Sequence, residues 1–186
     1  EVALKVIERG KFKIKEFPNK REIGRWADRI GEAYNNTFVN NWEYYPMTQG
    51  EIKLLLDNLL LVVDPKLVKI ITYNEKIVGF LIAFPDISKA LQRHGGRITP
   101  WGILDFFREM KKTNWVSLNG AGVLPEYHGR GGNALLYYEM EKAIKDSGFE
   151  HWELTQVAET AVQMRKDLIT AGGRQYKNHR VYHKRL

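Results

Sequence analysis

The chain has 186 residues, a formal net charge of +7 and no cysteine, and 44% of its residues are hydrophobic. This length predicts one domain with a sizeable core, and the missing cysteine excludes disulfides, thiolate metal sites and cysteine nucleophiles. The longest apolar run, residues 54–63, contains Asp57 and Asn58 and is too short to cross a bilayer. We therefore expect a cytoplasmic protein without a membrane partner.

Basic residues are spread along the chain, with a mild concentration at residues 174–185. Two interpretations stay open: a plain solvated exterior, which we favour, and a basic surface that attracts phosphates or nucleic acid. Nucleic acid is not an expected partner, whereas an anionic cofactor could use part of the charge. No pair of histidines or carboxylates has a convincing metal-ligand spacing, so we predict no metal.

The first half of the chain predicts a strand, two helices and a hairpin. Residues 12–17 nearly alternate between apolar and polar side chains, which is typical of a strand, and residues 21–38 have helical apolar spacing. Thr48 with Glu51 three residues later is a capping box, so a second helix is expected from there to about residue 61. The next predicted elements are strands at 67–73 and 77–84 joined by a turn at residues 74–75.

Residues 85–114 form a long insertion before the next predicted strand. We predict a short helix at 87–93, a turn at the Gly95-Gly96 pair and an amphipathic helix at 103–110. Three roles are open for this insertion: a lid, a dimer contact or an interface with a neighbouring domain.

The second half alternates strands and helices, which are expected at these ranges: strands at 115–124 and 151–157, helices at 133–146 and 161–171, and one or two final strands at 176–184. The Gly172-Gly173 pair is predicted to end the last helix. This order predicts a single domain of the α/β (α+β) class.

The glycine-rich segment between the strand at 115–124 and the helix at 133–146 is the strongest functional signal. Glycines let backbone N–H groups converge on a ligand, and the N-terminus of a helix attracts anions. Arg130 adds a permanent positive charge. Three interpretations are open: a phosphate site, an ordinary turn, and a dinucleotide fingerprint formed by Gly129, Gly131 and Ala134 with Glu153 as the ribose ligand. The last normally opens a domain rather than ending one, and no Gly-Lys-Ser/Thr sequence supports a Walker loop.

Residues 123–136 resemble motif A of the GNAT N-acetyltransferase superfamily, with Val-x-Pro-Glu-Tyr, then a glycine loop, a small residue and leucines. The resemblance implies a mixed, mostly antiparallel central sheet with splayed central strands and flanking helices over residues 1–186, with 85–114 as an insertion. The segment from Gly172 to the end is similar to a bacterial and archaeal branch in which the domain is often the C-terminal half of a longer protein. The absence of an initial methionine suits that interpretation.

Membership would imply acetyl-CoA, or another acyl-CoA, as the ligand. Its pyrophosphate would lie on the loop amides, and its pantetheine arm would pair with the strand before the loop. The implied cofactor-binding residues are Gly122, Val123, Leu124, His128, Gly129, Arg130, Gly131, Gly132, Asn133 and Ala134. His128 replaces the usual Gln or Arg and Asn133 the usual Gly or Ala, and Asn133 is expected to cap the helix.

Transfer to an amine requires a neutral amine, a donor for the developing oxyanion and a proton for the leaving thiolate. A backbone N–H of Val123 or Leu124 is the expected oxyanion donor. In many members of the superfamily a tyrosine on the last helix donates this proton, and Leu168 is at that position here. The substitute catalytic candidates are Glu159, Tyr176 and Glu153. Each has an alternative that stays open: Glu159 as a helix-cap carboxylate, Tyr176 as a core residue and Glu153 as a solvated carboxylate.

The acceptor amine is expected near the helix at 21–38 and the loop after it. The candidate acceptor-binding residues are Tyr34, Asn35, Trp42, Glu43, Tyr44 and Tyr45. The alternative is that these side chains pack the helix against the sheet. The predicted function is N-acetyl transfer to an amine of a small molecule or peptide. A catalytically silent CoA-binding module is the second hypothesis, and a homodimer or a neighbouring domain is a possible partner.

Overall fold

The computed structural model describes the chain except for residues 1, 42–43, 98, 156, 181 and 185–186. Contacts divide the chain into two compact units, Glu1–Glu153 and Leu154–Leu186. The prediction of one domain over residues 1–186 stays a prediction.

The centre of the larger unit is a sheet in the order β1-β2-β3-β4-β5. Its strands are β1 (Lys13–Lys15), β2 (Val68–Tyr73), β3 (Lys76–Pro85), β4 (Trp115–Val123) and β5 (His151–Leu154). The pairs β1–β2, β2–β3 and β3–β4 are antiparallel. This mostly antiparallel α/β sheet confirms the predicted fold class; the predicted splay of the central strands stays a prediction.

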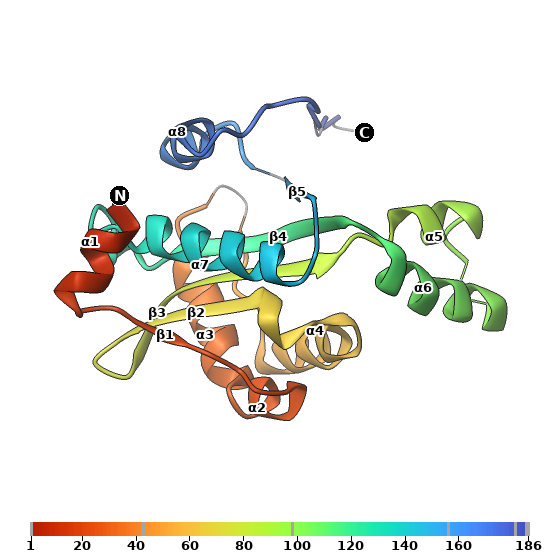
Figure 1. Cartoon of the computed structure of the whole chain (residues 1–186), viewed down its shortest axis with the longest axis horizontal. Coiled ribbons are helices and arrows are strands. Elements are labelled where there is room, and N and C mark those ends of the chain that lie inside the picture. Colours follow the sequence, from red (N-terminus) through yellow and green to blue (C-terminus); the bar gives the residue numbers. More distant parts are fainter. Residues whose placement is uncertain (1, 42–43, 98, 156, 181, 185–186) are drawn as a thin grey trace. The chain divides into compact units, whose positions relative to one another are not determined.

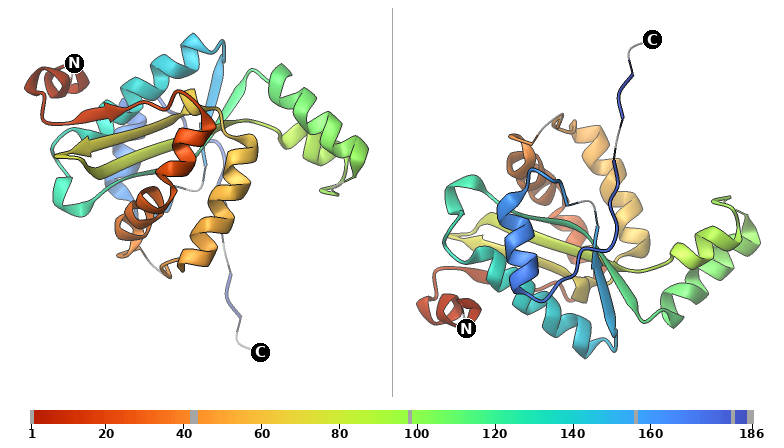
Figure 2. Two further views of the ribbon diagram at one scale, coloured as in Figure 1. Left: turned by 90° about the horizontal axis from the view of Figure 1, so that it is seen from below. Right: turned by 90° about the horizontal axis from the view of Figure 1, so that it is seen from above.

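Helices cover both faces of the sheet (Figures 1 and 2). On one face lie α2 (Lys20–Arg25), α3 (Ala27–Phe38) and α4 (Gln49–Val62), and on the other lies α7 (Gly132–Asp146). Because strand side chains alternate, Ile70 and Phe80 belong to the core under α2–α4. Ile71 points the other way, and its Cδ1 atom lies 3.0 Å from where a Cβ on Gly132 would stand.

The helix predicted over residues 21–38 is two helices that meet at Trp26. Trp26 has φ −97° and ψ 1°, and its N–H donates to the Ile23 carbonyl, which closes α2. The Trp26 indole packs edge-on against Phe17, with 6.0 Å between the ring centroids. The Arg29 guanidinium lies 4.0 Å from the centroid of the indole. Periodicity alone did not reveal this break because both helices present apolar side chains to one core.

Local signals placed two other features correctly. The capping box that begins α4 is complete, because the Thr48 hydroxyl accepts from the Glu51 amide and the Glu51 carboxylate accepts from the Thr48 amide. Asn74 and Glu75 both have positive φ, 47° and 62°, as a two-residue hairpin between β2 and β3 requires.

An N-terminal helix, α1 (Val2–Arg9), was not predicted. It buries Ala3 and Val6 and packs on α7. Eight residues with two buried positions are too few for a clear helical period. This helix is important because it lies at the glycine loop.

The insertion forms α5 (Ser88–Arg93) and α6 (Pro100–Lys112), close to the predicted ranges. Figure 1 shows them projecting from the end of the sheet opposite α1. Arg93 joins the two helices: its Nε donates to the Asp105 carboxylate at 2.8 Å and its Nη2 to the Glu109 carboxylate at 2.5 Å. These bonds raise the pKa of Arg93 and lower that of Asp105.

The smaller unit contains the helix α8 (Val162–Thr170). Its predicted glycine stop is confirmed: Gly172 has φ +88°, and the Gly173 amide donates to the Leu168 carbonyl at 2.9 Å. The strands predicted at 176–184 are wrong for the described residues 176–180 and 182–184, which have no strand structure. Tyr176 and Tyr182 are exposed, so the alternating pattern has no apolar surface to bury against.

Candidate functional site

The turn from β4 to α7 has a shape that demands glycine. After a 3₁₀ turn at Pro125–Tyr127, Gly129 has φ +71° and Gly131, the N-cap of α7, has φ +84°. Side chains rarely adopt such backbone angles. A Cβ on Gly131 would also lie 2.5 Å from Cγ2 of Val6, so α1 approaches the loop backbone closely.

The N-terminus of α7 is suited to an anion. The first bond along the helix runs from the Leu135 amide to the Gly131 carbonyl at 3.1 Å, so the amides of residues 132–134 precede the internal ladder. The first turn contains no acidic residue, and the N-cap is a glycine without a side-chain bond. The prediction that Asn133 caps this helix is wrong, because Asn133 is the second residue inside α7.

His128 holds the turn against the strand it leaves. Its Nε2 lies 2.7 Å from the Val123 carbonyl oxygen, and because a carbonyl only accepts, Nε2 is the donor. In the same turn Glu126 pairs with Lys76 at 3.2 Å. Its own backbone amide and Lys76 lower the pKa of Glu126, so this carboxylate is paired beside the loop.

Strand geometry distinguishes the two predicted oxyanion donors. The Leu124 amide donates to the Val78 carbonyl at 2.8 Å, so it is used within the sheet. Val123 stands opposite Gly79. Because donors in an antiparallel ladder alternate, the Val123 amide points away from β3. Of the two candidates, only Val123 has an amide directed away from β3, as the predicted oxyanion donor requires.

A β-bulge interrupts β4 at Asn119. Gly120 pairs with Ile82 and Leu118 pairs with Ala83, so Asn119 is an additional residue in the ladder. Bulges re-aim backbone groups and are frequent beside active sites. This feature was not predicted, although glycine inside a strand, here Gly120, is a known signal for one.

A cavity of about 340 Å³ lies beside the glycine loop. We call it the loop cavity; it is lined by Val6, Arg9, Lys11, Phe12, Tyr73, Gly129 and Arg130. It combines three cations with two aromatic rings, and the Arg130 guanidinium also lies 5.1 Å from the Tyr127 ring centroid. Of these lining residues only Gly129 and Arg130 were predicted, because the others come from α1, the segment after it and the end of β2.

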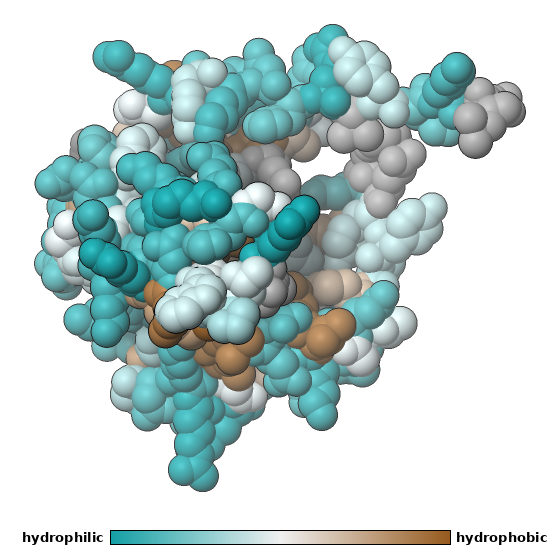
Figure 3. All heavy atoms as spheres, turned by 90° about the vertical axis from the view of Figure 1, so that its right-hand side faces the viewer, coloured by the Kyte–Doolittle hydropathy of each residue, from teal (hydrophilic) through white to brown (hydrophobic). Residues whose placement is uncertain are grey.

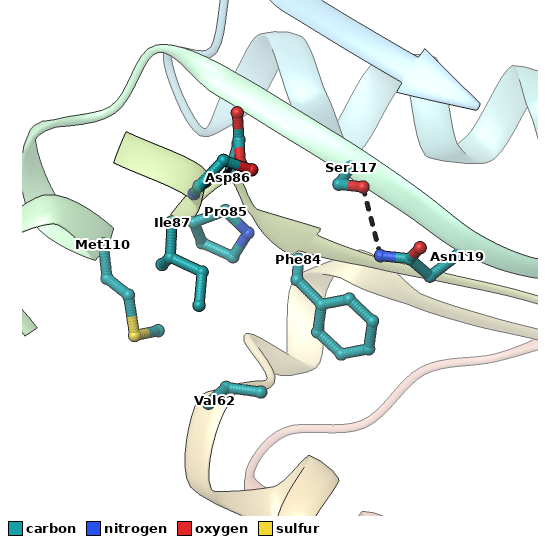
Figure 4. Close-up of a pocket in the computed structure, with 9 residues that line it drawn as sticks. Val62, Phe84, Pro85, Asp86, Ile87, Met110, Ser117 and Asn119 are labelled. Atoms are coloured by element: carbon teal, nitrogen blue, oxygen red, sulfur yellow. Dashed lines mark hydrogen bonds between the residues drawn. The ribbon is translucent and has the colours of Figure 1, made fainter. Parts of the chain in front are cut away.

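A second cavity, about 220 Å³, lies at the bulge of β4 (Figure 4). We call it the bulge cavity; it is lined by Val62, Phe84, Pro85, Asp86, Ile87, Ser88, Met110, Ser117 and Asn119. Most of the wall is apolar, and Asn119 Nδ2 donates to the Ser117 hydroxyl at 3.1 Å. The Asp86 carboxylate accepts from the Ser88 amide at 2.8 Å and from its hydroxyl at 2.5 Å.

The predicted acceptor residues have clear structural contacts. Tyr34 stacks on Phe80 with 5.6 Å between centroids, and burial raises its pKa. Asn35 anchors the following loop, since its side chain bonds the Met47 backbone and accepts from the Tyr44 hydroxyl at 2.6 Å. Burial also raises the pKa of Tyr44.

Tyr45 is 84% exposed. Trp42 and Glu43 lie outside the described residues. The contacts favour the packing alternative for Tyr34, Asn35 and Tyr44, and acceptor binding stays a prediction for all six candidates.

The predicted catalytic residues belong to both units. Glu153 is half-buried in β5. Glu159 is exposed before α8, where its carbonyl accepts from Arg165, and Tyr176 is exposed after α8. Leu168, at the position of the missing tyrosine, is half-buried in α8. The catalytic roles therefore stay predictions.

The described residues contain no group of three or more histidine or carboxylate side chains placed to hold a metal ion. Among the described helices, none is long and apolar enough to cross a membrane.

No known protein-family profile matches the chain. Two curated proteins are similar in sequence. A protein named bacterial ceramide synthase, from Caulobacter vibrioides, is 26% identical over 163 residues, which cover 84% of this chain and 42% of that protein. Protein YghO of Escherichia coli is 23% identical over 176 residues, covering 90% and 45%. The chain thus spans less than half the length of either relative.

Solved structures of acetyltransferases share its fold. The aminoglycoside N-acetyltransferase AAC(6')-Iy, in complex with CoA, superposes with a TM-score of 0.57 at 14% identity, over 94% of this chain and 95% of the other. The aminoglycoside acetyltransferase meta-AAC0020, from an uncultured soil metagenomic sample, reaches 0.59 at 12% identity, over 95% and 98%. A GNAT family acetyltransferase from Brucella melitensis, in complex with acetyl-CoA, reaches 0.52 at 15% identity, over 82% and 80%. The chain therefore shares the fold of these acetyltransferases, which confirms the predicted fold.

Proposed function

We propose that this chain is an acyl-CoA-dependent N-acyltransferase that transfers acetyl, or another acyl group, to an amine. The observation that carries the proposal is the junction of β4 and α7, where positive-φ glycines precede a helix N-terminus without an acidic first turn. Such a junction binds phosphate groups. The CoA and acetyl-CoA complexes of two proteins with the same fold support the choice of ligand.

The loop residues fit the charged part of CoA. We assign the pyrophosphate to the amides of residues 129–134 and to Arg130. The loop cavity is assigned to the adenosine 3′-phosphate end, with Arg9 and Lys11 as phosphate partners and Tyr73 as a surface for the base. Its volume of about 340 Å³ is that of a small ligand site.

The bulge in β4 marks the proposed reaction point. From Leu124 to Asn119 an extended strand spans about 17 Å, a length that an extended pantetheine arm can cover. The Val123 amide points away from β3 and is assigned to the arm. In this scheme bound acyl-CoA supplies the thioester. Because the Val123 amide is assigned to the arm, the re-aimed backbone at Asn119 replaces Val123 as the proposed oxyanion donor.

The acceptor amine is assigned to the bulge cavity. The Asp86 carboxylate lies in its wall, where it would attract an ammonium group, and the apolar side chains would exclude water. The amine must lose a proton before it attacks, and the thiolate must gain one. Glu153, Glu159 and Tyr176 remain the candidates for these transfers.

Two classes of acceptor follow from the comparisons. Two of the structural neighbours are aminoglycoside acetyltransferases, which suggests a small polar polyamine. One sequence relative is named a ceramide synthase, and a ceramide is an N-acylated long-chain amine. The apolar wall of the bulge cavity favours the second class.

Calorimetry with CoA and acetyl-CoA tests the cofactor, and thiol release tests turnover with an aminoglycoside, a short peptide and a long-chain amino alcohol as acceptors. Saturable CoA binding with sustained thiol release is the expected result. The absence of CoA binding would overturn the proposal. Binding without turnover for any acceptor would favour the silent CoA-binding module, which the leucine at position 168 motivates.

A further inference from the structure

The outer surface of α6 is apolar where solvent-facing helices are usually polar. Trp101 is 76% exposed, Leu104 is 62% exposed and Phe107 is 50% exposed, and Ile103 is exposed beside them. At helical spacing these four side chains share one half of the helix surface. We call them the α6 face. Single exposed apolar residues are ordinary, but four large ones together mark an interaction surface.

The segment that contains the α6 face has a net positive charge. From Ser88 to Lys112 there are six basic residues against two acidic ones, a net charge of +4. Both acids, Asp105 and Glu109, bond to Arg93 between the helices. On α6 itself Arg108, Lys111 and Lys112 follow the apolar side chains and are exposed.

Ion pairs connect α6 to α5 and to His94, the residue after α5. Arg93 joins α5 to both carboxylates of α6, and the His94 ring approaches Asp105 at 3.3 Å. In Figure 1 the two helices project from the end of the sheet. Figure 3 faces that end and shows brown hydrophobic side chains among teal hydrophilic ones.

We propose that the α6 face docks on the surface of an anionic lipid bilayer. A helix with aromatic and aliphatic side chains next to lysine and arginine lies in the membrane interface, where the rings enter the headgroup boundary and the cations meet lipid phosphates. Charge complementarity selects this occupant over a second copy of the chain, whose α6 face would carry the same positive charge.

This proposal departs from the sequence-based expectation of no membrane partner. That expectation rested on the absence of a segment long enough to span a bilayer, and an interfacial helix needs no span. The bulge cavity includes Met110 of α6 and Ile87 and Ser88 at the start of α5. The bulge cavity and the docking surface therefore share helix α6, although the docking itself does not depend on the proposed reaction.

Vesicle co-sedimentation tests the docking directly. The purified chain is mixed with phosphatidylcholine vesicles and with vesicles that contain phosphatidylglycerol as well. We expect it to sediment with the second kind only and to be released by added salt. Equal binding to both kinds, or binding to neither, would overturn the proposal.

Paired variants separate the α6 face from the rest of the surface. Leu104→Asp and Phe107→Asp are each expected to weaken vesicle binding about tenfold or more, and Lys111→Gln about fivefold. Leu54→Asp on α4 is the matched control, because Leu54 is 64% exposed, close to the 62% of Leu104. An equal loss in this control would mean that adhesion is spread over the surface and would contradict the assignment. Circular dichroism verifies that each variant is folded.

Trp101 provides a spectroscopic measurement of the same contact. Anionic vesicles should shift the tryptophan emission to shorter wavelength, and Trp101→Phe should abolish that shift while most of the sedimentation remains. A shift that persists in Trp101→Phe would contradict insertion of the α6 face. Light scattering identifies the competing occupant: a concentration-dependent dimer that Leu104→Asp dissolves would assign the face to a second copy instead.

Discussion

The two ends of β4 lie beside basic regions that differ in what surrounds the charges. At its C-terminal end Arg130, Arg9 and Lys11 line a cavity with glycine backbone and aromatic rings. At its N-terminal end the cations of α6 follow exposed tryptophan, leucine and phenylalanine. The first arrangement suits a discrete polyphosphate and the second an extended anionic surface. A net charge of +7 therefore says little about partners until the neighbours of each cation are known.

The largest expected effect is at the glycine loop. Gly131→Asp adds a negative charge at the α7 N-terminus, strains a residue at φ +84° and pushes Val6. Together these should weaken CoA binding about 100-fold, measured by calorimetry. Gly148→Asp is the matched control: its φ is +78° and a Cβ there meets nothing within 4 Å. If both variants lost CoA equally, backbone strain rather than the loop would explain the loss.

Between the two ends, Gly122 tests how tightly β4 is packed. A Cβ there would lie 2.3 Å from Cγ2 of Thr37 on α3, so Gly122→Ala should cost about 1–3 kcal/mol of unfolding free energy. Thr37→Ser removes that methyl and keeps the hydroxyl that donates to the Ala33 carbonyl. The double variant should regain most of the loss in chemical denaturation. Simple additivity of the two single changes would show that the contact is not the cause.

Two arginine variants, one at each end of β4, should affect CoA binding and vesicle binding separately. Arg9→Gln is expected to weaken CoA binding about fivefold but to leave dephospho-CoA binding unchanged, because only CoA carries the 3′-phosphate. It should not affect vesicle sedimentation. Arg108→Gln should do the reverse. The comparison between the two ends fails if either variant changes both measurements.

The smallest expected effect concerns the ion pairs of Arg93 with Asp105 and Glu109, which connect α5 to α6. Arg93 lowers the pKa of Asp105 in the folded chain, so the ion pair stabilises the fold above the ordinary aspartate pKa and that contribution is lost as pH falls through the lowered one. Arg93→Gln should lower the thermal midpoint at pH 7 by about 2 °C, since about half of the Arg93 side chain is exposed to solvent, which weakens its ion pairs. The difference from wild type should shrink below about pH 4. A constant difference from pH 7 to pH 3 would contradict the role of Asp105.

Much of the fold was predictable because its signals are local. The capping box at Thr48, the two-residue turn at Asn74 and the glycine stop at Gly172 each act through bonds between residues a few positions apart. The prediction of C-terminal strands was wrong because strand formation depends on more than such local signals. Alternation around Tyr176 describes a strand only if another strand or core is present to pair with it.

The glycine loop was the part of the site that the sequence by itself determined. Its backbone angles, the start of α7 and the proposed binding of phosphate depend on the consecutive residues 129–134. Only the tertiary structure decided which residues gather around it. Arg9 and Tyr73 reach the loop cavity through packing of α1 and the end of β2, and Asn119 becomes a bulge only because β3 stands opposite. Such proximity depends on contacts between distant segments, which no pattern along the chain records.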